Sequence, residues 1–233
     1  MANTLFVTGT DTDVGKTYIS GLLLKALQER GEKAAYYKAA MSGNERQKNG
    51  TILPGDALHV QRVSGLSQPM DTMCPYLYEH AYSPHLAARL EGNPVQLERV
   101  LDGFDQLCHQ YDYVVTEGSG GILCPLRFDK EGLLSLSDFV LARQIPCLLV
   151  AHAGLGTLNH VGLTAAYLHA QGIPLRGILL NHFQPGNLLH QDNCAMCPVL
   201  TGVPVVACVE EGQDHLPPSL LDPLFPPEKG ASL

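Results

Sequence analysis

The residues most suggestive of chemistry lie in a glycine-bearing turn near the start of the chain, at positions 9–17, which read GTDTDVGKT. A turn that leads from a strand into a helix aims backbone N–H groups at a polyphosphate, and the helix N-terminus adds partial positive charge. In such a loop Lys16 can reach the β- and γ-phosphates, and the hydroxyl of Thr17 can bind magnesium. The segment therefore predicts a site for a nucleoside triphosphate.

The spacing within this turn departs from the usual phosphate-loop pattern. The first glycine of that pattern falls at Thr10, and Gly9 stands one residue earlier. Two acids, Asp11 and Asp13, lie in a loop meant for anions, so we expect their carboxylates to point away from the phosphates. The order of strand, loop and helix favours the phosphate site over an ordinary glycine-rich turn beside a surface lysine.

Two charged residues stand at the ends of later apolar segments. Glu117 follows the stretch 113–116, where a carboxylate is costly to bury unless a cation or hydrogen-bond donors accompany it. Lys38 ends the stretch 34–38, and its alternative role is that of a solvated lysine at a strand end. Ligands of parallel sheets lie beyond the carboxyl ends of the strands, so both residues are candidates for a ligand site.

The elements that position these residues alternate between strand and helix. Apolar residues at helical spacing predict a helix over 15–30 that ends at Gly31. Residues 42–55 are polar and turn-rich, hence a loop, and Pro94 is expected to open a helix. The strands are expected at 4–8, 34–38, 113–117, 147–151, 175–180 and 204–209, and the other helices at 56–63, 94–110, 135–143 and 157–171.

This alternation predicts an α/β fold with a mostly parallel sheet and helices on both faces. Its 233 residues, 45% of them hydrophobic, can bury the core of one domain over 1–233, with the tail from Pro217 loosely held. A net charge of −8 argues against a nucleic-acid partner, which needs a basic surface. Because apolar runs are too short for a leader or a membrane span of about 20 residues, we expect a cytoplasmic protein.

The cysteines give little indication of a special site. Their odd count of seven and irregular spacing do not suggest a disulfide framework. Cys194 and Cys197 form one C-x-x-C pair, without the second pair or suitable histidines that a zinc site wants. A metal half-site or redox pair is one interpretation, and two small residues in a surface helix is the other.

Several segments together resemble the dethiobiotin synthetase family of P-loop NTPases. Residues 8–17 are similar to that family's variant phosphate loop, including its longer spacing. The resemblance covers about residues 1–183, and the combination is more specific than the first loop alone. The further segments, in the family's order, are Tyr37-Lys38 through Ser42-Gly43, Gly55-Asp56-Ala57, Ser83-Pro84-His85, residues 117–121, residues 154–160 and Asn181.

The resemblance implies an ATP-dependent ligase of biotin biosynthesis. Its small-molecule substrates would be 7,8-diaminopelargonic acid, carbon dioxide and ATP, with Mg²⁺ as cofactor. One amine takes up carbon dioxide as a carbamate, ATP phosphorylates the carbamate, and the second amine closes a ureido ring and expels phosphate. The family also implies a homodimer whose sites lie at the subunit interface.

The same resemblance assigns roles to individual residues. Lys38 and Lys16 would be the catalytic lysines, with Lys38 between the γ-phosphate and the carbamate. Magnesium would be bound by Thr17, Asp56 and Glu117, although Asp56 by pattern alone can cap the helix that starts there. The ATP-binding residues would be Asp13, Val14, Gly15, Lys16, Thr17, Tyr18, Asp56, Glu117, Gly118, Ser119, Gly120 and Asn181. The substrate-binding residues would be Thr12, Ser42 and, from the neighbouring subunit, Gly156, Thr157, Leu158 and Asn159.

Some of these segments have plainer alternatives, and some positions depart from the family. Residues 156–159 taken alone are an ordinary helix start, and residues 117–121 can form a plain loop. His182 stands where an aspartate is common, and Ala207 and Glu210 replace a glycine and a proline found in many members. These differences at the base-binding end predict ATP use with relaxed selectivity for the base.

Three other functions compete with the ligase. A cobyrinate diamide synthase usually carries an extra glutaminase domain, for which 233 residues leave no room. A partitioning-type ATPase places a second lysine five residues before the Gly-Lys lysine, and here that position is Asp11. A nonenzymatic nucleotide-binding protein would not need the second lysine at position 38 or the strand-end Glu117.

Overall fold

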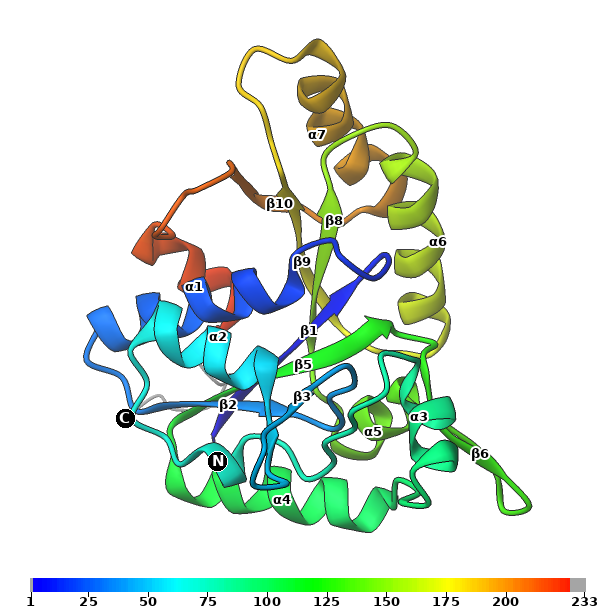
Figure 1. Ribbon diagram of the computed structural model, residues 1–233. Helices are drawn as coiled ribbons and strands as arrows, with labels where there is room; N and C mark the ends of the chain where they lie inside the picture. Colours follow the sequence, from blue (N-terminus) through cyan, green and yellow to red (C-terminus); the bar gives the residue numbers. More distant parts are fainter. Residues whose placement is uncertain (1, 227–233) are drawn as a thin grey trace, which may run out of the picture.

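The computed structural model describes residues 2–226. Within them a six-stranded parallel sheet has the strand order β10-β9-β8-β1-β5-β2, and helices lie on both of its faces (Figure 1). The predicted α/β class is therefore confirmed. The strands of this sheet are β1 (Asn3–Gly9), β2 (Ala34–Lys38), β5 (Tyr113–Gly121), β8 (Cys147–His152), β9 (Leu175–Asn181) and β10 (Val205–Val209).

The helices form two layers around the sheet. The first, α1, α2 and α8, covers one face, and α4 to α7 cover the other (Figure 1). None of the helices within residues 2–226 has the length and apolar composition that would let it cross a membrane. The helices are α1 (Lys16–Glu29), α2 (Gly55–Ser64), α3 (Pro84–Leu90), α4 (Leu97–Gln110), α5 (Leu136–Arg143), α6 (Thr157–Ala170), α7 (Leu188–Thr201) and α8 (Leu221–Leu224), with 3-10 turns at Met70–Thr72 and Pro218–Leu220.

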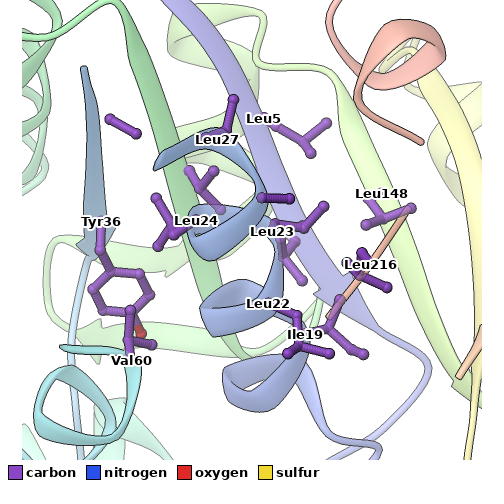
Figure 2. Packing of buried hydrophobic residues seen from close by; sticks show 14 of the residues in the cluster. Leu5, Ile19, Leu22, Leu23, Leu24, Leu27, Tyr36, Val60, Leu148 and Leu216 are labelled. Atoms are coloured by element: carbon purple, nitrogen blue, oxygen red, sulfur yellow. The ribbon is translucent and has the colours of Figure 1, made fainter. Parts of the chain in front are cut away.

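Helix α1 anchors the phosphate turn to the core. Its residues Ile19, Leu22, Leu23 and Leu27 recur at helical spacing and are fully buried against the sheet (Figure 2). Burying each such side chain stabilises the fold by about 1.5–3 kcal/mol. The helix therefore holds the turn before it in a fixed place at the end of β1.

Three predicted segments differ from the structure in detail. Helix α4 begins at Leu97 rather than at Pro94, because Val95 is buried and the backbone N–H of Gln96 donates to the hydroxyl of Tyr76, 2.9 Å away. The predicted loop 42–55 stays largely irregular, and within it lies a hairpin of two short strands, β3 (Glu45–Arg46) and β4 (Ile52–Leu53).

The second difference concerns the glycine segment after Glu117. It continues β5 rather than forming a loop, because Gly121 still pairs with Gly9 of β1. A hairpin of β6 (Pro125–Asp129) and β7 (Gly132–Ser135) then follows, which the sequence patterns did not predict.

The third difference concerns the segment from Pro217, which is not loosely held as far as residue 226. Leu220, Leu221 and Leu224 are buried in the same core cluster as α1, and Asp222 pairs with Arg30. These leucines lie at helical spacing and pack against α1. This packing holds the segment in place, although it is rich in proline. Residues 227–233, the rest of the predicted tail, lie outside the described part of the chain.

Candidate active site

A cavity of about 900 Å³ opens beyond the carboxyl ends of the parallel strands, where ligands of such sheets bind. Its walls come from the turn between β1 and α1, the ends of β2 and β5, the start of α2 and the loop before α3. Most of the residues predicted for the site line it together. They are Thr12, Asp13, Gly15, Lys16, Thr17, Tyr18, Lys38, Ser42, Asp56, Glu117, Ser119 and Gly120.

The turn before α1 presents free backbone N–H groups to this cavity. Gly15 caps the helix with φ +93°, and no side chain caps the first turn, so its N–H groups are free to meet an anion. A Cβ atom at Gly15 would lie 2.1 Å from the side-chain nitrogen of Asn181, so only glycine fits there. The geometry suits a phosphate group.

Lys16 lies folded back over the same turn. Its Nζ donates to the backbone carbonyl of Asp11 at 2.8 Å, and the residue is 7% exposed. Burial lowers the pKa of Lys16 below its usual value, although the charge of Glu117 opposes the shift. The carbonyl of Asp11 is a neutral acceptor, so an anionic phosphate would compete for this lysine, because charge-assisted hydrogen bonds are stronger.

A buried network centres on the carboxylate of Glu117. Lys38 Nζ donates to Glu117 Oε1 at 2.6 Å and to Asp56 Oδ2 at 2.7 Å. The Thr17 hydroxyl donates to Glu117 Oε1 at 2.8 Å, and the Tyr36 hydroxyl donates to Oε2 at 2.8 Å. We call these five residues the Glu117 network. The single ammonium group of this network contacts both of its carboxylates.

Burial and charge act in opposite directions on Lys38. Lys38 is 5% exposed and Glu117 only 1% exposed, so burial alone would lower the pKa of this lysine. The charges of Glu117 and Asp56 outweigh burial and raise the pKa of Lys38 above its usual value. Lys38 therefore carries a positive charge at every physiological pH.

The pairing of β2 with β5 brings the network together. Lys38 lies directly beside Glu117 in the strand register, and Tyr36 lies two residues earlier on the same face of β2. Asp56 enters from the first turn of α2, where it makes no capping hydrogen bond and instead contacts Lys38. The interpretation of Asp56 as a helix cap is therefore wrong.

The oxygen atoms of the network suit a magnesium ion. Mg²⁺ is usually held by one or two carboxylates together with phosphate oxygens and water, and Thr17, Asp56 and Glu117 offer oxygens of this kind. Within residues 2–226, no group of three or more His, Cys, Asp or Glu is arranged to hold a metal. The ammonium group of Lys38 already lies between the two carboxylates, which shows that this position favours a cation.

Three residues predicted to bind ATP do not line the cavity, namely Val14, Gly118 and Asn181. Asn181 donates from its side-chain nitrogen to the carbonyl of Val14 at 3.0 Å, so it supports the phosphate turn from β9. A Cβ atom at Gly118 would lie 3.0 Å from the ring of Phe6, so this glycine allows β5 to pack closely. His182 does line the cavity, with φ +54° and its ring stacked on His152 at 5.1 Å.

The four substrate residues expected from the neighbouring subunit lie elsewhere. Gly156, Thr157, Leu158 and Asn159 are at the start of α6, and none of them lines the cavity. The adjacent Leu155 is 91% exposed. Within one chain, the structure does not bring this segment to the other predicted residues.

Some residues of the cavity, and Tyr36 behind it, were missed by the sequence-based prediction. His59 lies one helical turn after Asp56, and Tyr36 alternates with Lys38 along β2, so the spacing of the known candidates could have indicated both. Cys124 also lines the cavity, and burial raises the pKa of its thiol to about 11. No spacing pattern indicated Cys124 or Tyr82, which also lines the cavity.

The C-x-x-C pair is part of helix α7. The sulfur of Cys194 lies 3.5 Å from that of Cys208 on β10. Both residues are free thiols, and Cys197 is buried. The pair therefore has the position expected for small packing residues in a helix.

Comparisons with known proteins identify the family. A family model described as "AAA domain" matches residues 3–219. The chain is 40% identical to the ATP-dependent dethiobiotin synthetase BioD of Brachyspira hyodysenteriae, over 97% of this chain and 100% of that protein. It is 39% identical to the protein of the same name from Clostridium novyi, over 92% of this chain and 90% of that protein.

Solved structures agree on the fold. The MinC:MinD cell division protein complex of Aquifex aeolicus matches with a TM-score of 0.56 and 15% identity, over 96% of this chain and 86% of that one. A ParA family ATPase from Chlorobium tepidum matches with a TM-score of 0.54 and 15% identity, over 96% and 89%. At this identity the likeness concerns the fold alone, whereas the two relatives above carry the matching name over nearly the whole chain. The chain belongs to the ATP-dependent dethiobiotin synthetase family.

Proposed function

We propose that this protein makes dethiobiotin from 7,8-diaminopelargonate, carbon dioxide and ATP, with release of ADP and phosphate. The family membership supports the reaction. The observation that carries the proposal is the buried lysine of the Glu117 network, because Lys38 lies in the same cavity as the free start of α1. A phosphoryl group and a carbamate can meet there.

The charges of the cavity suit phosphoryl transfer to a carbamate. The reaction brings several negative oxygens together, so the site must neutralise them and hold the reacting atoms in line. Lys16 and the N–H groups before α1 would bind the β- and γ-phosphates, and Lys38 would lie between the γ-phosphate and the carbamate. Lys38 suits this position because its neighbours keep it positively charged.

Thr17, Asp56 and Glu117 are the residues that would hold Mg²⁺. When bound, the ion neutralises charge on the phosphate oxygens and orients them. Asp56, which would help to hold the ion, contacts Lys38 at 2.7 Å, so the carboxylate and the lysine would act at one place in the cavity.

The same cavity offers room for the diamine. Ser42, Tyr82 and Ser83 also line it, and the hydroxyl oxygen of Ser42 is buried without a hydrogen-bond partner among the described residues. A buried polar atom of this kind costs about 1–3 kcal/mol unless a ligand satisfies it. Holding the diamine carbamate against ATP can lower the barrier by about 7–11 kcal/mol through orientation alone.

We propose that two copies of the chain complete each other's sites. The N–H groups at the start of α6, residues 156–159, would bind the distal carboxylate of the diamine in the neighbouring subunit. Exposed leucines beside and along this helix support an interface: Leu155 is 91% exposed and Leu163 is 65% exposed. A contiguous exposed apolar patch is typical of a surface that another chain covers, and these two leucines are the part of such a patch that we propose.

The nucleoside end supports two finer proposals. His182 offers a flat ring to the base rather than the carboxylate common in the family, which supports relaxed base selectivity. Tyr18 donates its hydroxyl to the carbonyl of Gln213, which ties the segment after β10 to α1 near the cavity.

A cytoplasmic location is the third proposal, and it rests on the prediction from the sequence.

The proposed reaction is tested by incubating the protein with ATP, Mg²⁺, bicarbonate and 7,8-diaminopelargonate. We expect dethiobiotin by mass spectrometry, together with one phosphate for each molecule formed. Omitting the diamine is the control and should stop phosphate release. Folded protein that releases phosphate without forming a ureido product would contradict the proposal.

A further inference from the structure

The two oxygens of the Glu117 carboxylate have separate partners. Oε1 accepts hydrogen bonds from Lys38 and Thr17, both of which line the cavity. Oε2 accepts one hydrogen bond, from the Tyr36 hydroxyl at 2.8 Å, and no other described residue bonds to it. Tyr36 does not line the cavity and is 0% exposed. It therefore contacts the carboxylate from the side that faces the core.

The ring of Tyr36 is held firmly by its packing. It belongs to the core cluster that includes Val60 of α2 and Leu24 of α1, and Figure 2 shows it beside Val60. Its side chain therefore cannot follow Glu117 if that carboxylate turns. The packing gives the hydroxyl a fixed position.

The backbone at Tyr36 is fixed as well. Strand β2 is at the edge of the sheet, where backbone groups lack a strand partner. The buried side-chain amide of Gln68 takes the place of that partner: its oxygen accepts from the N–H of Tyr36 at 2.7 Å, and its nitrogen donates to the carbonyl of Tyr36 at 3.0 Å. Ring and backbone are thus both held by the chain.

We propose that Tyr36 is a positioning residue that orients Glu117 for metal binding, an inference that rests on the proposed function. With Oε2 bonded to a fixed hydroxyl, the carboxylate cannot rotate freely, and Oε1 stays directed at Thr17 and the cavity. Groups that bond to a metal-binding carboxylate from behind affect the affinity for the metal about 10- to 100-fold. Tyr36 acts through Glu117 and contacts neither the substrate nor the metal.

The chain contains a matched control for this inference. Tyr37, the next residue, is 1% exposed, and its hydroxyl donates to the carbonyl of Val100 at 2.7 Å on the other face of the sheet. Tyr36→Phe and Tyr37→Phe each remove one buried hydroxyl and keep the ring. Both variants should fold and lose stability to a similar extent, measured as the midpoint of thermal unfolding. Only Tyr36→Phe removes a contact with Glu117.

The experiment measures Mn²⁺ binding to each protein in the presence of ADP by electron paramagnetic resonance. We expect Tyr36→Phe to bind Mn²⁺ about 10- to 100-fold more weakly, and Tyr37→Phe to stay within about twofold of the unchanged protein. The affinity for ADP without metal should be the same in all three. Higher Mg²⁺ concentrations should restore turnover in Tyr36→Phe, which a general loss of structure would not allow.

The outcomes separate the inference from the function on which it rests. Equal Mn²⁺ affinity in the two variants would overturn the role of Tyr36 while the proposed reaction stands. If the unchanged protein with ADP bound no Mn²⁺, both the metal site and the inference would fail. Dethiobiotin formation by the unchanged protein, measured in the same preparation, tests the reaction independently.

Discussion

The Glu117 network and the start of α6 hold residues predicted for the same reaction, yet their surroundings differ. In the network, Lys38 contacts two carboxylates at 2.6 and 2.7 Å, and Glu117 is 1% exposed. At the start of α6, none of residues 156–159 lines the cavity, and Leu155 beside them is 91% exposed. One region is complete within the chain, and the other faces outward.

The difference follows from the cost of burying charge. A buried carboxylate is costly unless donors and a cation surround it, so the chain itself must supply Lys38, Thr17 and Tyr36. Backbone N–H groups at a helix start can stay in water at little cost until an anion arrives. Only the first region therefore had to be assembled within a single chain.

Removing Lys38 should have the largest effect, because it acts on the region that is complete. We expect Lys38→Ala to lower kcat by about 10³-fold while ATP still binds, since a charge aimed at the reacting oxygens is lost. The unpaired carboxylates should also reduce the free energy of unfolding by about 3–5 kcal/mol. Single-turnover kinetics and urea unfolding measure the two effects.

Lys33→Ala is the control for this change, because Lys33 is an exposed lysine that lies over the ring of Tyr111. Lys33→Ala should change neither kcat nor the free energy of unfolding by much. Full activity in Lys38→Ala would remove the catalytic role proposed for this lysine. Normal stability with lost activity would mean that the carboxylates find other partners in the folded chain.

A charge at the start of α6 should have the next largest effect. We expect Leu155→Asp to weaken association of the two copies and to raise KM for the diamine about tenfold, with the affinity for ATP unchanged. The reason is that an unpaired carboxylate would be buried at the proposed interface. Light scattering measures the association of the two copies, and steady-state kinetics measures KM for the diamine.

Leu141→Asp on α5 is the matched control, because Leu141 is an exposed leucine on another helix. It should leave both the molar mass of the assembly and KM for the diamine unchanged. A Leu155→Asp variant that keeps the mass and the KM of the original protein would mean that the start of α6 serves no shared site. The contrast between the two regions would then need another explanation.

The sequence predicted the first region better than the second for a physical reason. Lys38, Asp56 and Glu117 follow strands or open a helix, and the rule for carboxyl ends of parallel strands places such residues at one edge. Tyr36 was missed although it alternates with Lys38, because a tyrosine in an apolar strand also fits a purely structural role. Its contact with Glu117 depends on the register between β2 and β5, which local patterns do not determine.

Other differences have the same origin in tertiary contacts. The helix expected from Pro94 starts at Leu97 because Tyr76, distant in the sequence, bonds to the backbone before it. Likewise, the glycine segment after Glu117 became strand because Gly9 pairs with it. Local sequence patterns predict elements, and contacts between elements adjust where those elements begin and end.

His182 tests the nucleoside end, where a smaller effect is expected. His182→Asp should raise the preference for ATP over other nucleotides about threefold to tenfold in kcat/KM. A carboxylate can accept a hydrogen bond from an amino group of the base, whereas a stacked imidazole offers mainly a flat surface. His169→Asp, an exposed histidine at the end of α6, is the control. Strict ATP dependence of the unchanged protein would contradict the premise of relaxed selectivity.

The smallest effect is expected at Cys194, because the structure gives its thiol only a packing role. Cys194→Ser should keep kcat/KM within about twofold and change the free energy of unfolding by about 1 kcal/mol or less. The residue lies in α7 with its sulfur 3.5 Å from Cys208, remote in sequence from every residue of the Glu117 network. Elemental analysis of the purified protein should show no zinc bound at a constant ratio. Stoichiometric zinc lost in Cys194→Ser would instead assign this helix a metal site, and would show that the half of the protein holding α6 and α7 has a function besides completing the neighbouring copy.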